Sequence, residues 1–346
     1  MPVSRWDEDA HYDRPRRHTR PRTKDRPSYK DATTALVTTV DRGRFTLLVP
    51  DGYEAGNEGV GAGHALTAMK SRTLGRTAVV VGDRVRVVGD RSGDKDSLAR
   101  IVEVEERRTV LRRTSDDDDP VERVIVANAE QLVVVTSLAD PPPRPRLIDR
   151  CLVAALDAGM GTLLCLTKVD LATPDVLLAA YRPLGVDAVA VTRGGDLEPL
   201  RARLRGRVSV LVGHSGVGKS TLVNALLPDA RRHIGVVNAV TGRGRHTSTS
   251  AVALPLSGGG WIVDTPGIRS FGLAHVDPSR LIRAFPDLAA ATSDCPRGCG
   301  HTAADPECAL DLAVAREQVD PDRVDSFRRL LSSRDVERGD ARGTDV

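Results

Sequence analysis

The chain has 346 residues, of which 40% are hydrophobic and 28% charged, and its formal net charge is +3. No apolar run approaches the ~18 residues that a transmembrane helix needs, and no apolar segment near the N-terminus predicts a secretory signal. At roughly 100–200 residues per domain, the length predicts two or three domains. Three of the five cysteines fall within 295–308, which favours a metal site over a disulfide framework. This cysteine usage also predicts a reducing, cytoplasmic location.

Residues 1–30 predict a basic disordered tail. They are rich in arginine, lysine and proline and hold almost no aliphatic side chains, so they cannot bury enough apolar surface to fold alone. Such a tail can neutralise the phosphates of RNA. The alternative is a solvated tail without a partner.

Residues 31–115 contain short β-branched runs separated by glycines, a pattern typical of a small β-barrel. An OB-fold is the favoured interpretation, and a barrel with only a packing role is the alternative. Because Phe45 and Tyr53 are its only aromatic residues, any RNA contact would depend on phosphates and shape rather than on base stacking. The expected strands are 35–40, 44–49, 77–81, 83–88, 98–104 and 109–111.

The acidic run 116–119 and Pro120 predict a solvated linker. Strands and helices then alternate across 120–272, which favours a largely parallel α/β sheet. Cys151 and Cys165 lie in apolar stretches and are expected to be core residues. The expected strands are 131–136, 162–166, 188–191, 208–212, 251–256 and 260–263, and the expected helices are 146–158, 174–181 and 197–204.

The segment 213–220, G-H-S-G-V-G-K-S, matches the phosphate-loop pattern G-x-x-x-x-G-K-[S/T] at every fixed position. It stands between the expected strand 208–212 and an expected helix at 221–227. Its backbone N–H groups would face phosphate oxygens, Lys219 would contact the β- and γ-phosphates, and Ser220 would bind Mg²⁺. A glycine-rich turn that binds nothing is the alternative. The candidate nucleotide-binding residues are Gly213, His214, Ser215, Gly216, Val217, Gly218, Lys219, Ser220 and Thr221.

A candidate base loop precedes this segment. It is formed by Thr167, Lys168, Val169 and Asp170, directly after the expected strand 162–166. The carboxylate of Asp170 can accept hydrogen bonds from the N1–H and N2–H₂ groups of guanine, a donor pair that adenine lacks. This loop therefore predicts selection of guanine.

Two further segments follow the phosphate loop. The first is D-T-P-G at 264–267. Its Asp264 can bind Mg²⁺ through a bridging water, and Gly267 can donate its N–H to the γ-phosphate. The polar loop 242–249 precedes it, and Thr247, with Thr249 as the alternative, would complete the Mg²⁺ shell when the γ-phosphate is bound. These residues predict a nucleotide-dependent switch.

Near the C-terminus, Cys295, Cys299, His301 and Cys308 supply three thiolates and one imidazole. That set suits a closed tetrahedral site for structural Zn²⁺, whereas a catalytic zinc keeps one position open for water. Free cysteines beside a chance histidine are the alternative. Residues 273–346 are therefore expected to form a helical zinc-binding domain stabilised by its metal, with helices at 309–318 and 322–331. Arg328, Arg329 and Arg334 are either an rRNA contact or an exposed face.

The order of the motifs is unusual, because the base loop precedes the phosphate loop. The same site can form in a circularly permuted chain, since domain termini usually lie close together. The barrel-like N-terminal part, this order, G-H-S-G-V-G-K-S-T at 213–221, G-R-H-T at 244–247, D-T-P-G and the Cys/His cluster resemble the RsgA/YjeQ family. These are circularly permuted GTPases that depend on the small ribosomal subunit, and the resemblance covers about residues 31–330.

The resemblance implies an OB-fold, a circularly permuted P-loop GTPase domain and a C-terminal helical zinc-binding domain. It implies hydrolysis of GTP to GDP and phosphate, stimulated by the small ribosomal subunit late in its maturation. The implied cofactors are GTP or GDP, Mg²⁺ and one structural Zn²⁺. The implied partners are the small subunit and its rRNA, with other assembly factors left open. We expect a monomer without a membrane partner.

Several positions depart from the family pattern. Thr167 replaces the usual asparagine, Ser248 interrupts a run of threonines, and the metal cluster is one residue shorter in its first gap and one longer in its last. Ile268 occupies the position of the water-orienting glutamine of many GTPases, and an apolar side chain cannot hold a water. His246 is the candidate catalytic replacement; the alternative is a loop histidine that contacts rRNA or solvent.

Three rival interpretations stay open at this point. A P-loop ATPase or kinase is favoured by Thr167 and opposed by Asp170. A protein that uses GTP only as a structural cofactor is favoured by Ile268. An enzyme whose chemistry lies in the metal cluster has only the cysteines in its support.

Overall fold

The computed structural model describes residues 29–50, 63–94, 97–114, 122–228, 251–265, 273 and 276–333. Most of the predicted basic tail lies outside these residues. So do the predicted linker 116–120 and several positions singled out above, namely Tyr53, His246, Thr247, Ser248, Thr249, Gly267, Ile268 and Arg334.

The first folded part is a closed five-stranded barrel. Its strands pair in the order β1-β2-β3-β5-β4, and pairing of β1 with β4 closes the barrel. Only β3 and β5 run parallel. Leu47, Leu66, Val85 and Ile101 point inward and are fully buried. This is the predicted OB-like arrangement. The elements are β1 (Thr33–Asp41), β2 (Arg44–Pro50), β3 (Gly63–Lys70), the 3₁₀ helix η1 (Arg72–Leu74), β4 (Arg84–Gly89) and β5 (Ala99–Val104).

One strand prediction in this part was wrong, and one strand was missed. Residues 77–81 form no strand; Val81 makes one isolated bridge to Val126, and the N–H of Val80 donates to Asp83 Oδ2 at 2.8 Å instead of to a neighbouring strand. The strand β3 was missed because Gly63 and its small neighbours resemble a loop. Gly63 is needed there, since a Cβ would lie 2.4 Å from the carbonyl oxygen of Val49.

A two-stranded antiparallel sheet follows, formed by β6 (Val110–Thr114) and β7 (Glu122–Ala127). The strand β7 was not expected from the sequence. Asn128 directly after it donates to the carbonyl of Gly82 at 2.9 Å, while its own Oδ1 accepts from the N–H of Arg108 at 2.8 Å. These bonds fix the ends of both strands.

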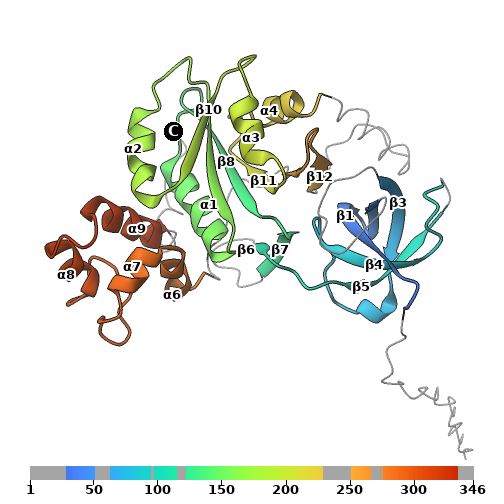
Figure 1. Ribbon diagram of the computed structural model, residues 1–346, viewed down its shortest axis with the longest axis horizontal. Helices are drawn as coiled ribbons and strands as arrows, with labels where there is room; N and C mark the ends of the chain where they lie inside the picture. The colour runs from blue at the N-terminus through green and yellow to red at the C-terminus, as the bar shows by residue number, and fades with distance from the viewer. Residues whose placement is uncertain are drawn as a thin grey trace, which may run out of the picture. The chain divides into compact units, whose positions relative to one another are not determined.

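The α/β part is built on a sheet of order β10-β9-β8-β11-β13-β12. Figure 1 labels four of these strands, β10, β8, β11 and β12. The first five strands are parallel and β12 is antiparallel to β13. A single pair, Thr39 with Val252, links β12 to β1. The expected α/β alternation is confirmed. The strands are β8 (Gln131–Ser137), β9 (Gly161–Thr167), β10 (Asp187–Val191), β11 (Val208–Val212), β12 (Val252–Pro255) and β13 (Trp261–Asp264).

Helices cover both faces of this sheet because its strands are apolar on both sides. Leu132 and Val134 of β8 share a core with α1, whereas Val133 and Val135 share a second core with α3 and α4. Cys151 and Cys165 are buried core residues, as expected, and burial raises the pKa of each thiol to about 12. The helices are α1 (Pro145–Asp157), α2 (Asp175–Tyr181), the 3₁₀ helix η2 (Arg182–Leu184), α3 (Glu198–Leu204) and α4 (Lys219–Leu226).

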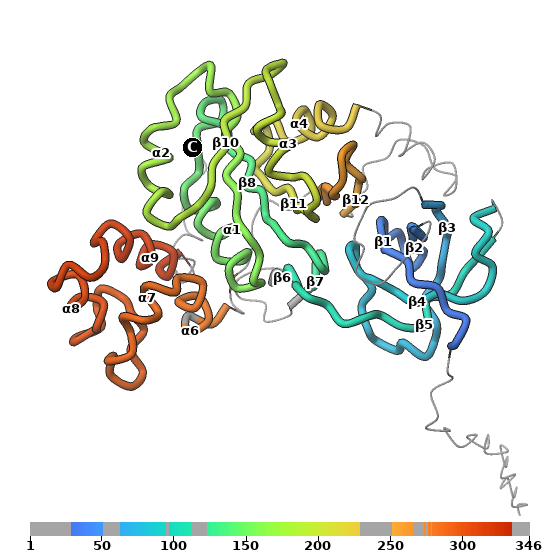
Figure 2. The backbone as a smooth tube through the Cα atoms, in the orientation of Figure 1, coloured from blue at the N-terminus to red at the C-terminus, as the bar shows by residue number. Residues whose placement is uncertain are grey.

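The C-terminal part is helical, as Figure 2 shows in the orange and red stretch of the tube. Phe285 and Phe327 meet edge to face in its core, with centroids 5.4 Å apart. The helix α8 ends three residues before the predicted end, close to Glu317, whose positive φ of 56° breaks a helix. The elements are α6 (Pro278–Leu281), the 3₁₀ helix η3 (Ile282–Ala284), α7 (Pro286–Ala291), α8 (Ala309–Ala315) and α9 (Pro321–Ser333). None of the helices in the described ranges is long and apolar enough to span a membrane.

The helix α9 packs against α1 and η2 through an arginine. Arg329 approaches the buried carboxylate of Asp149 on α1 at 3.3 Å and donates to the carbonyl of Ala180 at 2.9 Å. Its guanidinium also lies over the ring of Tyr181, 5.1 Å from the centroid. Arg328 pairs with Asp311 at 2.8 Å. Both arginines thus make contacts inside the chain, which neither interpretation of this cluster foresaw.

We predict that Arg329→Met lowers the free energy of unfolding by about 2–3 kcal/mol, because it leaves Asp149 buried without its cation. Burial raises the pKa of Asp149, and the charge of Arg329 opposes that rise. Without Arg329 the pKa of Asp149 rises further, so its carboxyl group is protonated over a wider pH range in the variant. The loss should therefore be smaller in mildly acidic than in mildly basic buffer. Chemical denaturation at both pH values measures it. Arg316→Met, at an exposed position, is the matched control, and equal losses in the two arginine variants would contradict the assignment.

Candidate functional site

The carboxyl edge of the parallel sheet gathers three of the predicted motifs. Thr167 at the end of β9 pairs with Ser137 of β8 and with Val191 of β10. On the other side of β8, Leu211 of β11 pairs with Asp264 of β13. The base loop, the phosphate loop and Asp264 therefore leave the sheet at the same edge, where α/β proteins bind their ligands.

The phosphate loop depends on its glycines. A Cβ on Gly213 would lie 2.5 Å from the carbonyl oxygen of Val135, so only glycine lets this loop lie so close to β8. Gly216 and Gly218 have φ of 84° and 92°, which glycine adopts without strain. Gly218 is the N-cap of α4, so the first turn of that helix begins at Lys219.

The polar side chains of the phosphate loop are either exposed to solvent or lie within hydrogen-bond distance of another group of the chain. Lys219 donates to the carboxylate of Asp264, and both side chains are largely buried. Ser215, Ser220 and Thr221 are exposed, while the His214 ring lies 2.8 Å from the carbonyl oxygen of Ser215. The structure thus brings a cation and a carboxylate, predicted independently, into contact at the mouth of the loop.

Asp264 is held in place by the residue that follows it. Thr265 is fully buried, and its hydroxyl donates to the carbonyl of Leu211 at 3.0 Å. That bond ties the end of β13 to the strand that leads into the phosphate loop. The position of Asp264 relative to Lys219 is therefore fixed from both strands.

The base loop is anchored at its first residue and open at its last. The hydroxyl of Thr167 donates to the carbonyl of Val217 in the phosphate loop at 2.7 Å. Lys168 has a positive φ of 58° and donates to the carbonyl of Asp140. Val169 packs against the core. Asp170 is exposed, so its carboxylate is accessible to a ligand.

Two neighbouring loops were missed from the sequence. The segment after β8 lies against the phosphate loop, since a Cβ on Gly216 would be 3.4 Å from Cδ of Pro141. The loop 192–195 follows β10 beside the base loop, and a Cβ on Gly195 would be only 2.2 Å from Oγ1 of Thr192. Both loops follow the carboxyl end of a parallel strand, and that position is the signal that could have found them.

The four predicted metal ligands meet in the C-terminal part. Their ligand atoms all lie within 4.8 Å of one another. Nδ1 of His301 is 3.5 Å from the sulfur of Cys295, 3.5 Å from that of Cys299 and 3.9 Å from that of Cys308. Burial lowers the pKa of His301, which favours the neutral imidazole that a metal binds.

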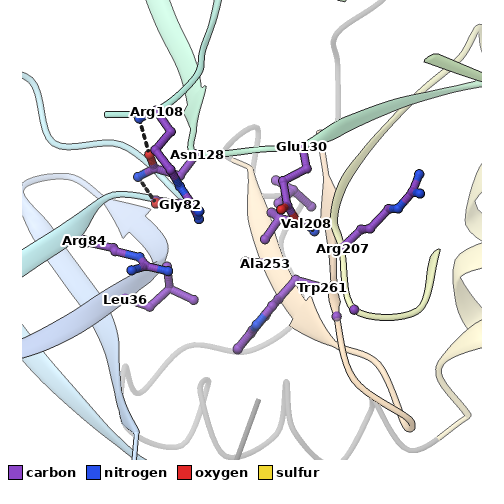
Figure 3. A pocket seen from close by; sticks show the side chains of 13 residues that line it. Leu36, Gly82, Arg84, Arg108, Asn128, Glu130, Arg207, Val208, Ala253 and Trp261 are labelled. Atoms are coloured by element: carbon purple, nitrogen blue, oxygen red, sulfur yellow. Dashed lines mark hydrogen bonds between the residues drawn. The ribbon is translucent and has the colours of Figure 1, made fainter. Parts of the chain in front are cut away.

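A pocket of about 80 Å³ lies apart from these motifs (Figure 3). Arg84, Glu130, Arg207 and Trp261 are among its lining residues, and no residue of the phosphate loop or base loop contributes. The hydrogen bonds drawn there join Arg108, Asn128 and Gly82. These polar groups hold strands together, so this pocket is a weaker candidate for the functional site than the carboxyl edge of the sheet.

The RsgA GTPase family model matches residues 104–274. The small ribosomal subunit biogenesis GTPase RsgA from Chlorobaculum parvum is 38% identical over 275 residues, which are 77% of this chain and 88% of that protein. The chain belongs to the RsgA GTPase family. The RsgA protein from Shewanella oneidensis is 37% identical over 287 residues, which are 80% of this chain and 79% of that one.

Two solved structures share the fold. The crystal structure of YjeQ from Thermotoga maritima aligns with a TM-score of 0.60 at 23% identity and covers 88% of this chain and 98% of that chain. YloQ, a circularly permuted GTPase, aligns with a TM-score of 0.61 at 23% identity and covers 90% of this chain and 98% of that chain. The predicted permuted architecture is therefore confirmed. As a member of the RsgA family, the chain is a GTP-hydrolysing enzyme that uses GTP, GDP and Mg²⁺.

We predict that Gly213→Ala weakens GTP and GDP binding at least tenfold, because its Cβ would force the phosphate loop away from Val135. Titration with fluorescent nucleotides measures the affinity. Gly161→Ala is the matched control, since a Cβ there would meet only an ordinary contact of 3.5 Å with the carbonyl of Glu130. Unchanged affinity in Gly213→Ala would show that the loop does not hold the phosphates.

Proposed function

We propose that the chain is a GTPase that binds the small ribosomal subunit and acts in its late maturation, with turnover stimulated by that subunit. The observation that carries this proposal is the meeting of the base loop, the phosphate loop and Asp264 at one sheet edge, in permuted order. The relatives named small ribosomal subunit biogenesis GTPase support the choice of partner.

In this proposal each motif has one task. Residues 213–221 hold the phosphates, with Lys219 as the cation and Ser220 as a Mg²⁺ ligand. Asp264 orients Mg²⁺ through water, and Asp170 selects guanine. Thr247, His246 and Gly267 keep the roles predicted from the sequence: Mg²⁺ coordination, help with the attacking water, and a hydrogen bond to the γ-phosphate.

We further propose that the cysteine and histidine cluster holds one structural Zn²⁺. Zinc bonds of about 2.3 Å to sulfur and about 2.0 Å to nitrogen put the sulfur and nitrogen corners of a tetrahedron roughly 3.5 Å apart. Two of the three measured separations to His301 have this value, and the third is 3.9 Å. The residues present fit the ion, and four protein ligands leave no position for a reacting water.

The remaining parts of the proposal concern the rest of the chain. The barrel and the basic tail bind rRNA, and the protein acts as a monomer, with other assembly factors as further candidate partners. The proposed boundaries are a tail at 1–30, a barrel at 31–115, a GTPase domain at 120–272 and a metal-binding helical domain at 273–346.

We predict that purified small ribosomal subunits raise the GTPase kcat at least tenfold and that large subunits do not. Phosphate release at saturating GTP measures it. GTP bound tightly by the wild-type protein but not turned over faster with small subunits would contradict the proposed partner.

We also predict that Asp170→Asn needs about 100-fold more GTP for half-maximal turnover, because the amide cannot accept both guanine donors.

We predict that the purified protein contains one zinc ion per chain and that Cys308→Ser loses it. Because the metal site closes the loop between α7 and α8, its loss should lower the melting temperature of the C-terminal part and leave GDP binding within about twofold. Elemental analysis and calorimetry test this. Cys165→Ala is the control, since that buried thiol lies in the sheet. Equal zinc content in both variants would contradict the assignment of Cys308 as a ligand.

A further inference from the structure

The pocket of about 80 Å³ lies at the amino edge of the parallel sheet. Among its lining residues, Glu130 directly precedes β8, Val208 is the first residue of β11 and Trp261 is the first residue of β13. The phosphate loop and Asp264 stand at the other ends of β11 and β13, so an occupant of this pocket would leave the nucleotide edge free.

The barrel supplies other lining residues of the same pocket. Leu36 lies on β1, and Arg84 is the first residue of β4. Sites that enclose a whole small-molecule ligand have volumes of roughly 300–1,000 Å³, well above this one. The pocket can therefore hold a small ion, or one group of a larger molecule whose remainder stays outside.

Trp261 brings a hydrogen-bond donor to this pocket. Its side chain is only 7% exposed, and its backbone N–H donates to the carbonyl of Arg207 at 2.8 Å, which fixes the residue at the start of β13. The indole N–H makes no hydrogen bond to any residue in the described part of the chain. Because the N–H of a buried tryptophan usually has a partner, this donor points to an acceptor from outside the chain.

Two arginines add positive charge. Arg84 and Arg108 both line the pocket, and Figure 3 shows Arg84 on the side opposite Trp261. A guanidinium carries five N–H donors, so it can bind an anion in addition to its contacts within the chain. Glu130 is the one acidic residue among the described residues of the lining, and its Oε2 already accepts from the N–H of Val208 at 2.9 Å. Donors outnumber acceptors, which favours an anion.

A phosphate group fits these donors. The planar fork of an arginine matches phosphate oxygens, and most hydrogen bonds from proteins to nucleic acids go to the phosphates and sugars. In RNA each phosphate projects from a long chain, so one of them can enter a small pocket while its neighbours stay outside. A five-stranded barrel of the OB type is also a common platform for oligonucleotides.

We propose that this pocket binds a single backbone phosphate of RNA, held by Arg84, Arg108 and the indole N–H of Trp261. The inference rests on the proposed function, whose partner is the small ribosomal subunit, and it names one point of contact with that partner. RNA bound there touches both the barrel and the amino edge of the sheet while GTP or GDP occupies the carboxyl edge.

Tryptophan fluorescence tests the site directly, since Trp6 and Trp261 are the only two tryptophans in the sequence. In Trp6→Phe protein saturated with GDP, a short oligouridylate should change the emission of Trp261 and reach a plateau. A morpholino oligomer of the same base sequence, whose backbone is uncharged, should have no effect. An unchanged emission with RNA, or an equal response to the morpholino oligomer, would overturn the phosphate assignment.

Inorganic phosphate separates the two sources of this group. It should need a concentration about 100-fold higher than that of RNA phosphates, because only RNA places further phosphates near the basic surface. A response at equal concentrations would identify a site for free phosphate and overturn the assignment to RNA.

Anisotropy of fluorescein-labelled oligouridylate gives the affinities of variants. Arg84→Gln and Trp261→Phe should each raise the Kd about tenfold, since each removes a hydrogen bond to a charged group. Arg84→Gln should also lower the salt dependence, the slope of log Kd against log salt concentration, by roughly 0.7. Arg44→Gln, at an exposed position of β2 outside the pocket, removes the same charge and should change the Kd by less than about twofold.

GDP titration of each variant gives the fraction of folded protein and corrects the Kd for it. Equal losses of RNA affinity in Arg84→Gln and Arg44→Gln, or unchanged affinity in both pocket variants, would overturn the pocket. If small subunits still stimulated the wild-type GTPase, the proposed function would stand. Absence of that stimulation would instead contradict the proposed function, so the two failures are distinguishable.

Discussion

The parallel register of β8, β9 and β11 is the constraint on which the site depends. Because neighbouring parallel strands end at one edge, residues far apart in sequence meet there regardless of the order in which the chain visits them. The base loop can therefore precede the phosphate loop without changing the site. The buried, β-branched strands that hold this register also explain why circular permutation is tolerated: the core lies in the pairing and not in the connections.

Two polar contacts join the motifs at this edge, where we propose that the nucleotide binds. Lys219 meets Asp264, and Thr167 meets Val217, so each motif is held by another that lies elsewhere in the chain. The first contact places a cation beside the carboxylate proposed for Mg²⁺, and the second sets the base loop. The Cys/His cluster is a separate local feature, in which four side chains that could hold a metal ion come together from short loops.

The positions of the phosphate-loop segment, the base-loop segment and the Cys/His cluster could be predicted because each pattern requires particular residue types at short, fixed spacing. The bond from Thr167 to Val217 could not, since it joins residues fifty positions apart and depends on strand register. The contacts of Arg329 were equally hidden, because a basic residue on an amphipathic helix resembles an exposed one until its partner on α1 is known. The strand β3 was missed because glycine and alanine make up much of it and Thr67 is its only β-branched residue.

The central claim is that the permuted chain assembles one site selective for guanine nucleotides. Competition of unlabelled GDP and ADP against a fluorescent guanine nucleotide on the wild-type protein tests it most directly. The account predicts that ADP competes at least 100-fold more weakly than GDP, because adenine lacks the donor pair that Asp170 accepts. Equal competition by the two nucleotides would contradict it.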